Sequence, residues 1–526
     1  MKARLQAGGA RSRSARGQVR NTGWAVVILL LGSWLTGCGG VGPESSSPPA
    51  PELPPPSMDR LRPPPEPVER PPAAGPGEEE ARPGADDPAE AAQGSWLEAG
   101  PGLESEADGG ASLVPTLDDA LWKEVEPQVR ALWVVRTSLV HPDSARAAVQ
   151  RAHRAGFNTL LVQVRGRGDA WYRSGLEPRA DPLAGTHPAY DPLQVVLDEA
   201  RALGLSVHAW LNVHLVAGAT GLPSDELHLV HRRPEYLSVP RELAYHLFAA
   251  DPRSPQYRET LMAWARENGS QVEGLYTSPL LPEVTEHLTR VVGELLAYYD
   301  LDGIHLDYLR FPSSQFDFSR PALEAFRSRL RATRPRGDLQ GAESWWNRGE
   351  IMAYVDAFPG EWDQFRRDAI TQTLRQIRGV VEGAEGELTL TAAVFPDLQD
   401  ARNHRFQPWE EWLQGGLVDA VAPMSYTDQV PAFRRALERA RAAGGGSRIW
   451  MGVGSYTNTF PGAVGKGRMI RDAGVAGIVL FSYDWAVGPE GRANAGGDYL
   501  GLFSREVFLD GLLDSAHPGP REGWRR

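Results

Sequence analysis

Eight short apolar runs recur along the chain from about residue 131, and amphipathic segments with helical spacing separate most of them. The runs are residues 131–137, 159–165, 205–213, 303–309, 388–395, 418–426, 449–455 and 477–483. Runs of this length that alternate with helices are typical of βα units in a parallel sheet. Eight such units predict an α/β fold, a closed (β/α)8 TIM barrel. A doubly wound open sheet is the alternative, but no Gly-x-Gly-x-x-Gly turn follows the first run.

Helices are predicted between several of these strands, at about 143–156, 191–203, 283–299 and 361–381. Two long irregular insertions, 214–282 and 313–360, follow the third and fourth strands. Loops of this length usually carry function. Both leave the carboxyl ends of strands, the face at which (β/α)8 barrels hold their active sites. We therefore expect the two insertions to wall a groove.

The first 37 residues have the composition of an export signal. Residues 1–20 contain basic but no acidic side chains, and the apolar run from Trp24 to Leu35 is too short to span a bilayer comfortably. The run that ends at Cys38 resembles a bacterial lipoprotein signal peptide, which implies a lipid anchor on Cys38 in the membrane. Because Gly39 follows, the same resemblance implies the outer membrane, facing the periplasm. An ordinary buried cysteine behind a cleaved signal is the alternative.

Residues 38–120 are rich in proline and glutamate and poor in aliphatic side chains. Such a composition buries too little apolar surface to offset the entropy of ordering, so a disordered tether is predicted. The barrel domain is then expected at 121–515. Cys38 is the sole cysteine, so no intramolecular disulfide can form. The net charge of −12 argues against a nucleic-acid partner.

Polar and aromatic residues gather at the carboxyl ends of the predicted strands. Parallel strands are buried on both faces, so a carboxylate is costly within a strand but can meet a cleft at its end. Asp307 ends the fourth strand and is the first candidate for a catalytic group; capping the next loop is the alternative. The residues predicted to bind substrate around it are Gln163, Arg165, Trp171, Tyr172, His208, Trp210, Asn212, His305, Arg310, Tyr426, Tyr483, Asp484 and Trp485.

These residue types narrow the chemistry. No His-x-His pair and no His-Glu-x-x-His motif occurs among the 12 histidines, so neither a metal site nor a cofactor is predicted. Two carboxylates on adjacent strands, Asp307 and Asp397, suit cleavage of a glycosidic bond. That reaction needs one acid to protonate the leaving oxygen and one carboxylate to attack or to activate water. Arg165, Arg310 or a nearby tyrosine would push their pKa values apart, and Asp484 or Glu410 could replace Asp397.

A family resemblance rests on several segments of the predicted barrel. They are residues 161–165 with 169–172, 208–212, 303–308 with Phe311 and Pro312, 365–368 and 422–426. Together they resemble the glycoside-hydrolase-10-like lipoprotein family over about residues 130–485. The resemblance implies a (β/α)8 fold, an envelope location and hydrolysis of a glycan, because members are similar to an enzyme that cuts peptidoglycan strands lacking stem peptides.

This chain departs from the family at one position. Relatives commonly carry two consecutive aspartates where this chain has Asp307 and Tyr308, so the second acid is missing. We expect a membrane-anchored glycoside hydrolase that acts on a cell-envelope polysaccharide, with peptidoglycan glycan as the leading substrate. A non-catalytic glycan-binding lipoprotein is the alternative, and a barrel hydrolase of another class, such as a deacetylase, is more distant. Aromatic residues of the insertions would stack on sugar rings or pack the loops down: Tyr276, Trp345, Trp346 and Trp362.

Overall fold

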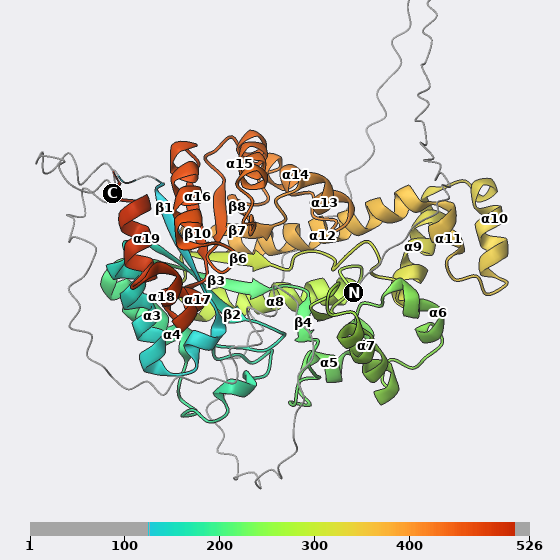
Figure 1. Ribbon diagram of the computed structural model, residues 1–526. Helices are drawn as coiled ribbons and strands as arrows, with labels where there is room; N and C mark the ends of the chain where they lie inside the picture. Colours follow the sequence, from blue (N-terminus) through green and yellow to red (C-terminus); the bar gives the residue numbers. More distant parts are fainter. Residues whose placement is uncertain (1–124, 126, 511–526) are drawn as a thin grey trace, which may run out of the picture. The chain divides into compact units, whose positions relative to one another are not determined.

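The computed structural model describes residues 125 and 127–510 (Figure 1). The predicted export signal at 1–37, Cys38 and the tether at 38–120 lie outside the described residues, as do both ends of the domain predicted at 121–515. In the described part, a sheet of eight parallel strands lies at the centre and helices surround it.

The sheet forms the predicted (β/α)8 barrel. Its strands are β1 (Val129–Val134), β2 (Thr159–Arg165), β3 (Ser206–Asn212), β6 (Gly303–Asp307), β7 (Thr389–Val394), β8 (Ala420–Pro423), β9 (Trp450–Gly454) and β10 (Gly477–Phe481). Their order is β8-β7-β6-β3-β2-β1-β10-β9, and two parallel bridges, Val421 to Ile449 and Met424 to Gly452, join β8 to β9. Each strand overlaps one of the eight predicted runs, so the fold prediction is confirmed.

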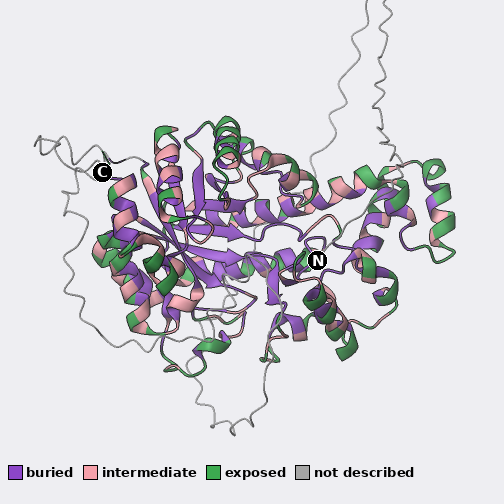
Figure 2. Ribbon diagram, in the orientation of Figure 1, coloured by how far each residue is buried: buried purple, intermediate pink, exposed green. Residues whose placement is uncertain are grey.

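The outer helices turn an apolar face to the strands and a polar face to solvent (Figure 2). They are α3 (Pro142–Arg154), α4 (Pro192–Leu203), α8 (Pro282–Tyr298), α12 (Pro359–Glu382), α13 (Leu398–Asn403), α14 (Trp409–Gln414), α15 (Val430–Gly444), α16 (Phe460–Asp472), α17 (Tyr483–Val487), α18 (Pro489–Ala495) and α19 (Tyr499–Val507). The four predicted helices correspond to α3, α4, α8 and α12. Each of these four begins with a proline, whose fixed φ suits the first helical turn and whose missing N–H costs nothing there.

Alternation along the strands divides the core into two layers. Residues such as Leu132 and Val134 pack against the helices, whereas the interposed Ala131 and Trp133 face the barrel interior. The interior layer combines bulky and small side chains: Trp133, Trp210 and Trp450 with Ala131, Ala420 and Ala422. A Cβ at Gly452 would lie 2.8 Å from the Pro423 carbonyl oxygen and 3.3 Å from the Trp133 ring, so the close approach of the Pro423 backbone requires a glycine there.

The two insertions carry elements that the sequence pattern does not reveal. The first holds the antiparallel pair β4 (Leu215–Gly218) and β5 (Gly274–Tyr276) with α5 (Leu229–Arg232), α6 (Ala244–Leu247) and α7 (Pro255–Glu267). The second holds α9 (Arg320–Thr333), α10 (Arg336–Trp346) and α11 (Ala353–Ala357). Both extend from the same end of the barrel (Figure 1).

Of the two roles predicted for the four aromatics, stacking on sugar rings or packing the loops down, the structure supports packing for Tyr276 and for Trp362, which lies in α12. Tyr276 and Trp362 are each only 2% exposed, because they pack inside the apolar core. Trp346 packs edge-on against Phe248 and Tyr354, and Trp345 is exposed.

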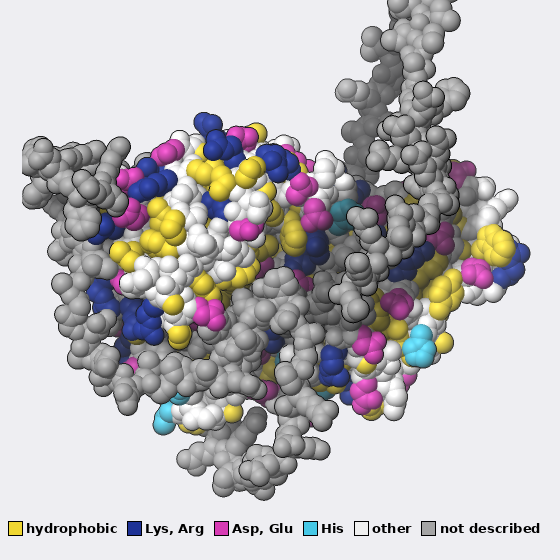
Figure 3. All heavy atoms as spheres, in the orientation of Figure 1, with side chains coloured by type: hydrophobic (Ala, Val, Ile, Leu, Met, Phe, Trp, Pro, Cys, Tyr) yellow, Lys and Arg dark blue, Asp and Glu magenta, His cyan; other side chains and the backbone are white. Residues whose placement is uncertain are grey.

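Acidic and basic side chains are interspersed over the face shown in Figure 3. Between residues 127 and 510, no helix is both long and apolar enough to cross a membrane.

Candidate active site

A cavity of about 510 Å³ opens at the carboxyl ends of the strands. Its lining residues are Trp133, Trp210, Glu273, Asp307, Tyr308, Arg310, Phe395, Pro396, Asp397, Met424, Ser425, Tyr426, Thr427, Ala432, Arg435, Ala436, Arg439, Tyr456 and Phe481. The cavity therefore brings together five of the residues predicted from the sequence: Asp307, Asp397, Trp210, Arg310 and Tyr426.

Asp307 is the last residue of β6 and is 6% exposed. Its Oδ1 accepts a hydrogen bond of 2.7 Å from the backbone N–H of Tyr308. Burial raises the pKa of Asp307 from 3.8 to about 6, because an apolar environment disfavours the charged form, and the Arg310 guanidinium opposes the shift in part. The Trp210 indole N–H also lowers this pKa, although its geometry falls short of a hydrogen bond. A carboxyl group of this kind can donate a proton near neutral pH.

The chain turns sharply directly after Asp307. Tyr308 has a φ of 52°, in the left-handed region that costs a residue with a side chain about 1 to 2 kcal/mol. The turn sets the Tyr308 ring against the Arg310 guanidinium, with 4.6 Å between the guanidinium carbon and the ring centroid. Tyr308 thus lines the cavity with an aromatic ring.

Glu273, a residue of the first insertion, also lines the cavity. Its Oε1 accepts a hydrogen bond of 2.8 Å from Nη2 of Arg310, and its Oε2 accepts one of 2.6 Å from the Tyr276 hydroxyl. Burial opposes ionisation, but the Arg310 charge and these two donors hold the pKa of Glu273 below its ordinary value. The cavity therefore contains an ionised carboxylate as well as the more protonated Asp307.

Asp397 stands at the rim as the N-cap of α13. Its Oδ1 accepts the backbone N–H groups of Gln399 and Asp400 at 3.0 Å, and its Oδ2 accepts a bond of 2.5 Å from Arg439. The N–H of Asp400 and the Arg439 charge lower the pKa of Asp397, and its side chain is 50% exposed. The predicted carboxylate of Asp397 therefore lines the cavity and also caps the N-terminus of α13.

Aromatic rings form one wall of the cavity. Tyr426 stacks on Phe481 with ring centroids 5.3 Å apart, and Trp133 meets both rings edge-on. Trp210 also meets the Phe481 ring edge-on, with the ring centroids 6.4 Å apart. Such a wall offers flat apolar surface beside the carboxyl groups, as small-molecule sites commonly do.

Two predicted histidines face the barrel interior without lining the cavity. The N–H of Trp133 donates to Nε2 of His305 at 3.1 Å, so Nδ1 of His305 carries the proton and donates to the Thr391 hydroxyl at 2.8 Å. Burial lowers the pKa of His305 to about 3 and that of His208, which packs on Trp450, to about 4. Both ring nitrogens of His305 are therefore used in hydrogen bonds inside the barrel, one with Trp133 and one with Thr391.

The predicted amides also lie outside the lining. The Gln163 amide oxygen accepts a bond of 2.7 Å from Arg136, and its amide nitrogen lies 3.4 Å from the Asn212 oxygen. Asn212 donates to the carbonyl oxygen of Gly166 at 2.8 Å. These bonds connect the ends of β2 and β3 to the segments that follow β1 and β2.

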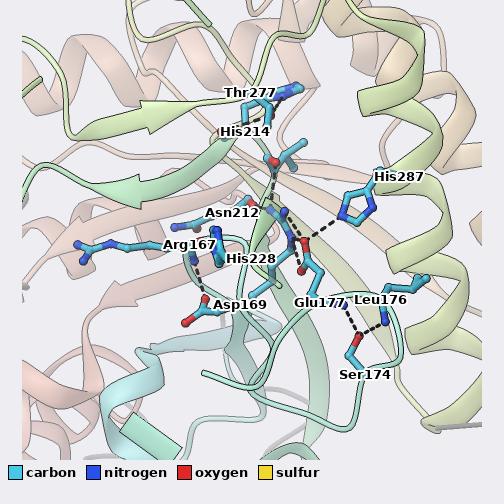
Figure 4. Close-up of polar contacts among 12 residues, drawn as sticks. Arg167, Asp169, Ser174, Leu176, Glu177, Asn212, His214, His228, Thr277 and His287 are labelled. Atoms are coloured by element: carbon cyan, nitrogen blue, oxygen red, sulfur yellow. Dashed lines mark hydrogen bonds and ion pairs between the residues drawn. The ribbon is translucent and has the colours of Figure 1, made fainter. Parts of the chain in front are cut away.

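Arg165 has a structural partner in place of the predicted substrate. Its Nε and Nη2 donate to the Glu177 carboxylate at 2.8 and 2.7 Å, and both side chains are 1% exposed. His287 of α8 contacts the same carboxylate at 3.1 Å (Figure 4). Although burial opposes it, the Arg165 charge keeps the pKa of Glu177 well below its ordinary value.

The remaining predicted residues lie away from the main cavity. Trp171 lines a second cavity of about 190 Å³, and the Tyr172 hydroxyl donates to Glu294 at 3.3 Å in the helix-facing core. Asp484 accepts a bond of 2.8 Å from the backbone N–H of Val135, one of 3.2 Å from Thr137 and a third from Ser138.

Asp484 therefore fastens the end of β1, and this network leaves it outside the cavity, where it cannot replace Asp397. Its neighbours in α17 serve packing: Tyr483 is buried, and Trp485 meets Tyr499 edge-on.

Comparison with known proteins identifies the family of the chain. A family model described as glycosyl hydrolase-like 10 matches residues 128–459, more than half of the sequence. The chain belongs to the glycosyl hydrolase-like 10 family.

Two bacterial proteins resemble part of it. It is 26% identical over 295 residues to glycosyl hydrolase DigH of Escherichia coli K12, with 52% of this chain and 55% of that protein covered. It is 23% identical over 294 residues to glycosyl hydrolase YngK of Bacillus subtilis 168, with 52% and 46% covered. The chain thus spans about half the length of these curated relatives.

Solved structures with low sequence identity are similar as well. The glycoside hydrolase domain of PgaB from Bordetella bronchiseptica matches with a TM-score of 0.42 at 12% identity, over 70% of this chain and 98% of that one. A β-galactosidase from Marinomonas ef1 matches with a TM-score of 0.47 at 12% identity, over 74% and 60%.

Sequence reasoning missed three charged residues of this glycosyl hydrolase-like 10 site, and the one carboxylate among them is Glu273. Glu273 lies in an irregular insertion without periodicity, and only the pairing of β5 with β4 carries it to the cavity. The signal available was a glutamate directly before Gly274 in the short run Val-Glu-Gly-Leu-Tyr. Arg435 and Arg439, one turn apart on α15, also line the cavity, and no prediction was made for them.

No group of three or more His, Cys, Asp or Glu side chains in the described part of this family member is arranged to hold a metal ion.

Proposed function

We propose that the chain is a glycoside hydrolase that cleaves a cell-envelope polysaccharide, with peptidoglycan glycan strands as the leading substrate. One observation carries the proposal: Asp307, buried and with its pKa raised to about 6, lies in an aromatic-walled cavity at the carboxyl ends of the barrel strands. Membership of the glycosyl hydrolase-like 10 family supports it. The similar proteins DigH and YngK are both named as glycosyl hydrolases, which supports hydrolysis of a glycosidic bond as the reaction class.

In this proposal Asp307 acts as the general acid. Its protonated carboxyl gives a proton to the glycosidic oxygen as the bond to the anomeric carbon breaks. Burial keeps the acid protonated to higher pH than an exposed aspartate, so the proton is available when the bond breaks. The rings of Trp210 and Tyr426 border the space that a sugar residue would occupy. Asp397 remains the candidate that the sequence offers for the second carboxylate.

The location belongs to the same proposal. Cys38 carries the lipid, residues 38–120 give the barrel reach, and the outer membrane holds the anchor with the barrel facing the periplasm. This arrangement would present the cavity to the cell wall. Metabolic labelling with a radioactive fatty acid tests it: the wild-type chain is expected to take up label and Cys38→Ala is not.

The activity test uses the full chain with purified glycan strands from sacculi, with and without their stem peptides, and measures new reducing ends. Wild type is expected to release fragments. The rate of release by Asp307→Asn is expected to be about 10²- to 10⁴-fold lower, with an unchanged circular dichroism spectrum. Fragment release by Asp307→Asn at the wild-type rate would refute the role of Asp307. Binding of the strands without any cleavage by wild type would instead support a glycan-binding lipoprotein.

A further inference from the structure

Hydrolysis of a glycosidic bond by the usual route uses two carboxyl groups, and the residue next to Asp307 in the chain is Tyr308. Three carboxyl groups line the cavity: Asp307, Glu273 and Asp397. Glu273 and Asp397 differ in their contacts, and these contacts indicate which of them assists Asp307.

The backbone of the first insertion fixes Glu273 at the barrel mouth. β4 begins three residues after the end of β3 and pairs antiparallel with β5, in the register Gly218 to Gly274 and Leu215 to Tyr276. The carbonyl oxygen of Glu273 accepts the N–H of Ala219 at 3.1 Å. Gly274 has a φ of 153°, and a Cβ there would lie 1.9 Å from the Ala217 carbonyl oxygen, so this close pairing requires glycine. A two-stranded ribbon thus holds the glutamate, where a free loop would let it move.

The side chain of Glu273 is held in one orientation and one ionisation state. Arg310 and the Tyr276 hydroxyl each donate to a different carboxylate oxygen, at 2.8 and 2.6 Å. Arg310 is itself clamped, with its guanidinium carbon 4.6 Å from the Tyr308 ring centroid and 5.1 Å from that of Phe395. The Glu273 side chain still has 18% of its surface exposed, against 4% for Arg310, and it lines the cavity. It is therefore oriented but reachable.

Asp397 has the opposite properties. It caps α13 through two backbone N–H groups, pairs with Arg439 and is half exposed to solvent. Removing its charge would disturb a surface cap and a surface ion pair, both of which are common structural duties of aspartate.

We propose that Glu273 is the second catalytic carboxylate of this cavity; the inference rests on the proposed glycoside hydrolase function. Glu273 accepts a proton from a water molecule whose oxygen attacks the anomeric carbon. The bond from that carbon to the glycosidic oxygen breaks, its electron pair stays on the oxygen, and the oxygen takes the proton of Asp307. Arg310 and Tyr276 are positioning residues that keep the glutamate ionised and aimed. The first insertion thereby supplies the second carboxylate of the site.

The test compares four variants of the full chain on the glycan strands that wild type cleaves. Glu273→Gln is expected to lower kcat by about 10² to 10⁴ with little change in KM. The matched surface control Glu259→Gln, an exposed residue of α7, is expected to stay within about threefold of wild type, and Asp397→Ala is expected to form no glycosyl azide. Glu273→Ala provides the chemical test: sodium azide is expected to enter the vacated space, restore turnover and leave a glycosyl azide product detectable by mass spectrometry.

The outcomes separate this inference from the proposed function. Glu273→Gln activity near that of wild type, or Glu273→Ala that forms no glycosyl azide while Asp397→Ala does, would overturn the role of Glu273 and leave the hydrolase proposal standing. A wild-type chain that cleaves no glycan would overturn both. A glutamate with a purely structural role would lower activity through misfolding, which circular dichroism detects, and azide would then yield no azide product.

Discussion

Asp307 is predicted to be both essential for catalysis and harmful to stability. Its folded pKa of about 6 lies about two units above the ordinary 3.8. Each unit corresponds to about 1.4 kcal/mol, so the charged side chain costs the folded state about 3 kcal/mol at high pH. Because Asp307 is only 6% exposed, little of this cost is screened by solvent.

The sign of the pH dependence follows from the proton affinities. The folded state binds the Asp307 proton more tightly than the unfolded state, so stability falls as pH rises from about 4 to about 6 and then levels off. Asparagine has no proton to lose and can still accept the N–H of Tyr308. We therefore expect Asp307→Asn to be about as stable as wild type near pH 4 and about 2 to 3 kcal/mol more stable at pH 8.

Urea denaturation of the full-length wild type and variant, followed by tryptophan fluorescence at pH 4, 6 and 8, measures this difference. Asp397→Asn is the control, because the pKa of Asp397 is lowered and its neutralisation should give no stabilisation at pH 8. A variant that is less stable than wild type at pH 8, or a stability difference that does not change with pH, would show that burial of the Asp307 charge is not the cause.

Two further predictions concern the frame of the site. Glu177→Gln should lower the free energy of unfolding by about 3 to 5 kcal/mol at neutral pH, because it leaves the Arg165 charge buried without its partner, and thermal denaturation measures the loss; a cost below about 1 kcal/mol would contradict a buried pair. Gly274→Ala should reduce glycan cleavage at least tenfold by pushing β5 from β4, a displacement that hydrogen exchange of residues 215–218 would report. Unchanged activity with unchanged exchange would show that this ribbon does not position Glu273.

The site is less predictable from sequence than the barrel, for a physical reason. Strand periodicity is local, so each of the eight runs and the four predicted helices could be recognised within a short window. Alternation along β6 also places His305 and Asp307 on the same face of the strand. It could not tell which of the inward residues reach the cavity and which, like His305 and Gln163, find partners inside the barrel. Those partners come from strands and loops far away in the chain.

By itself the sequence determined the eight βα units, the exposed end of the barrel and the place of Asp307 at that end, because all three depend on the order of apolar and polar residues along the chain. Only the tertiary structure decided the pKa of Asp307, the role of Asp397 as the N-cap of α13 and the position of Glu273 in the cavity. Burial depends on everything that packs around a group, and Glu273 reaches Arg310 across 37 residues of sequence only because β4 and β5 pair. Contacts of that kind leave no periodic trace in the sequence.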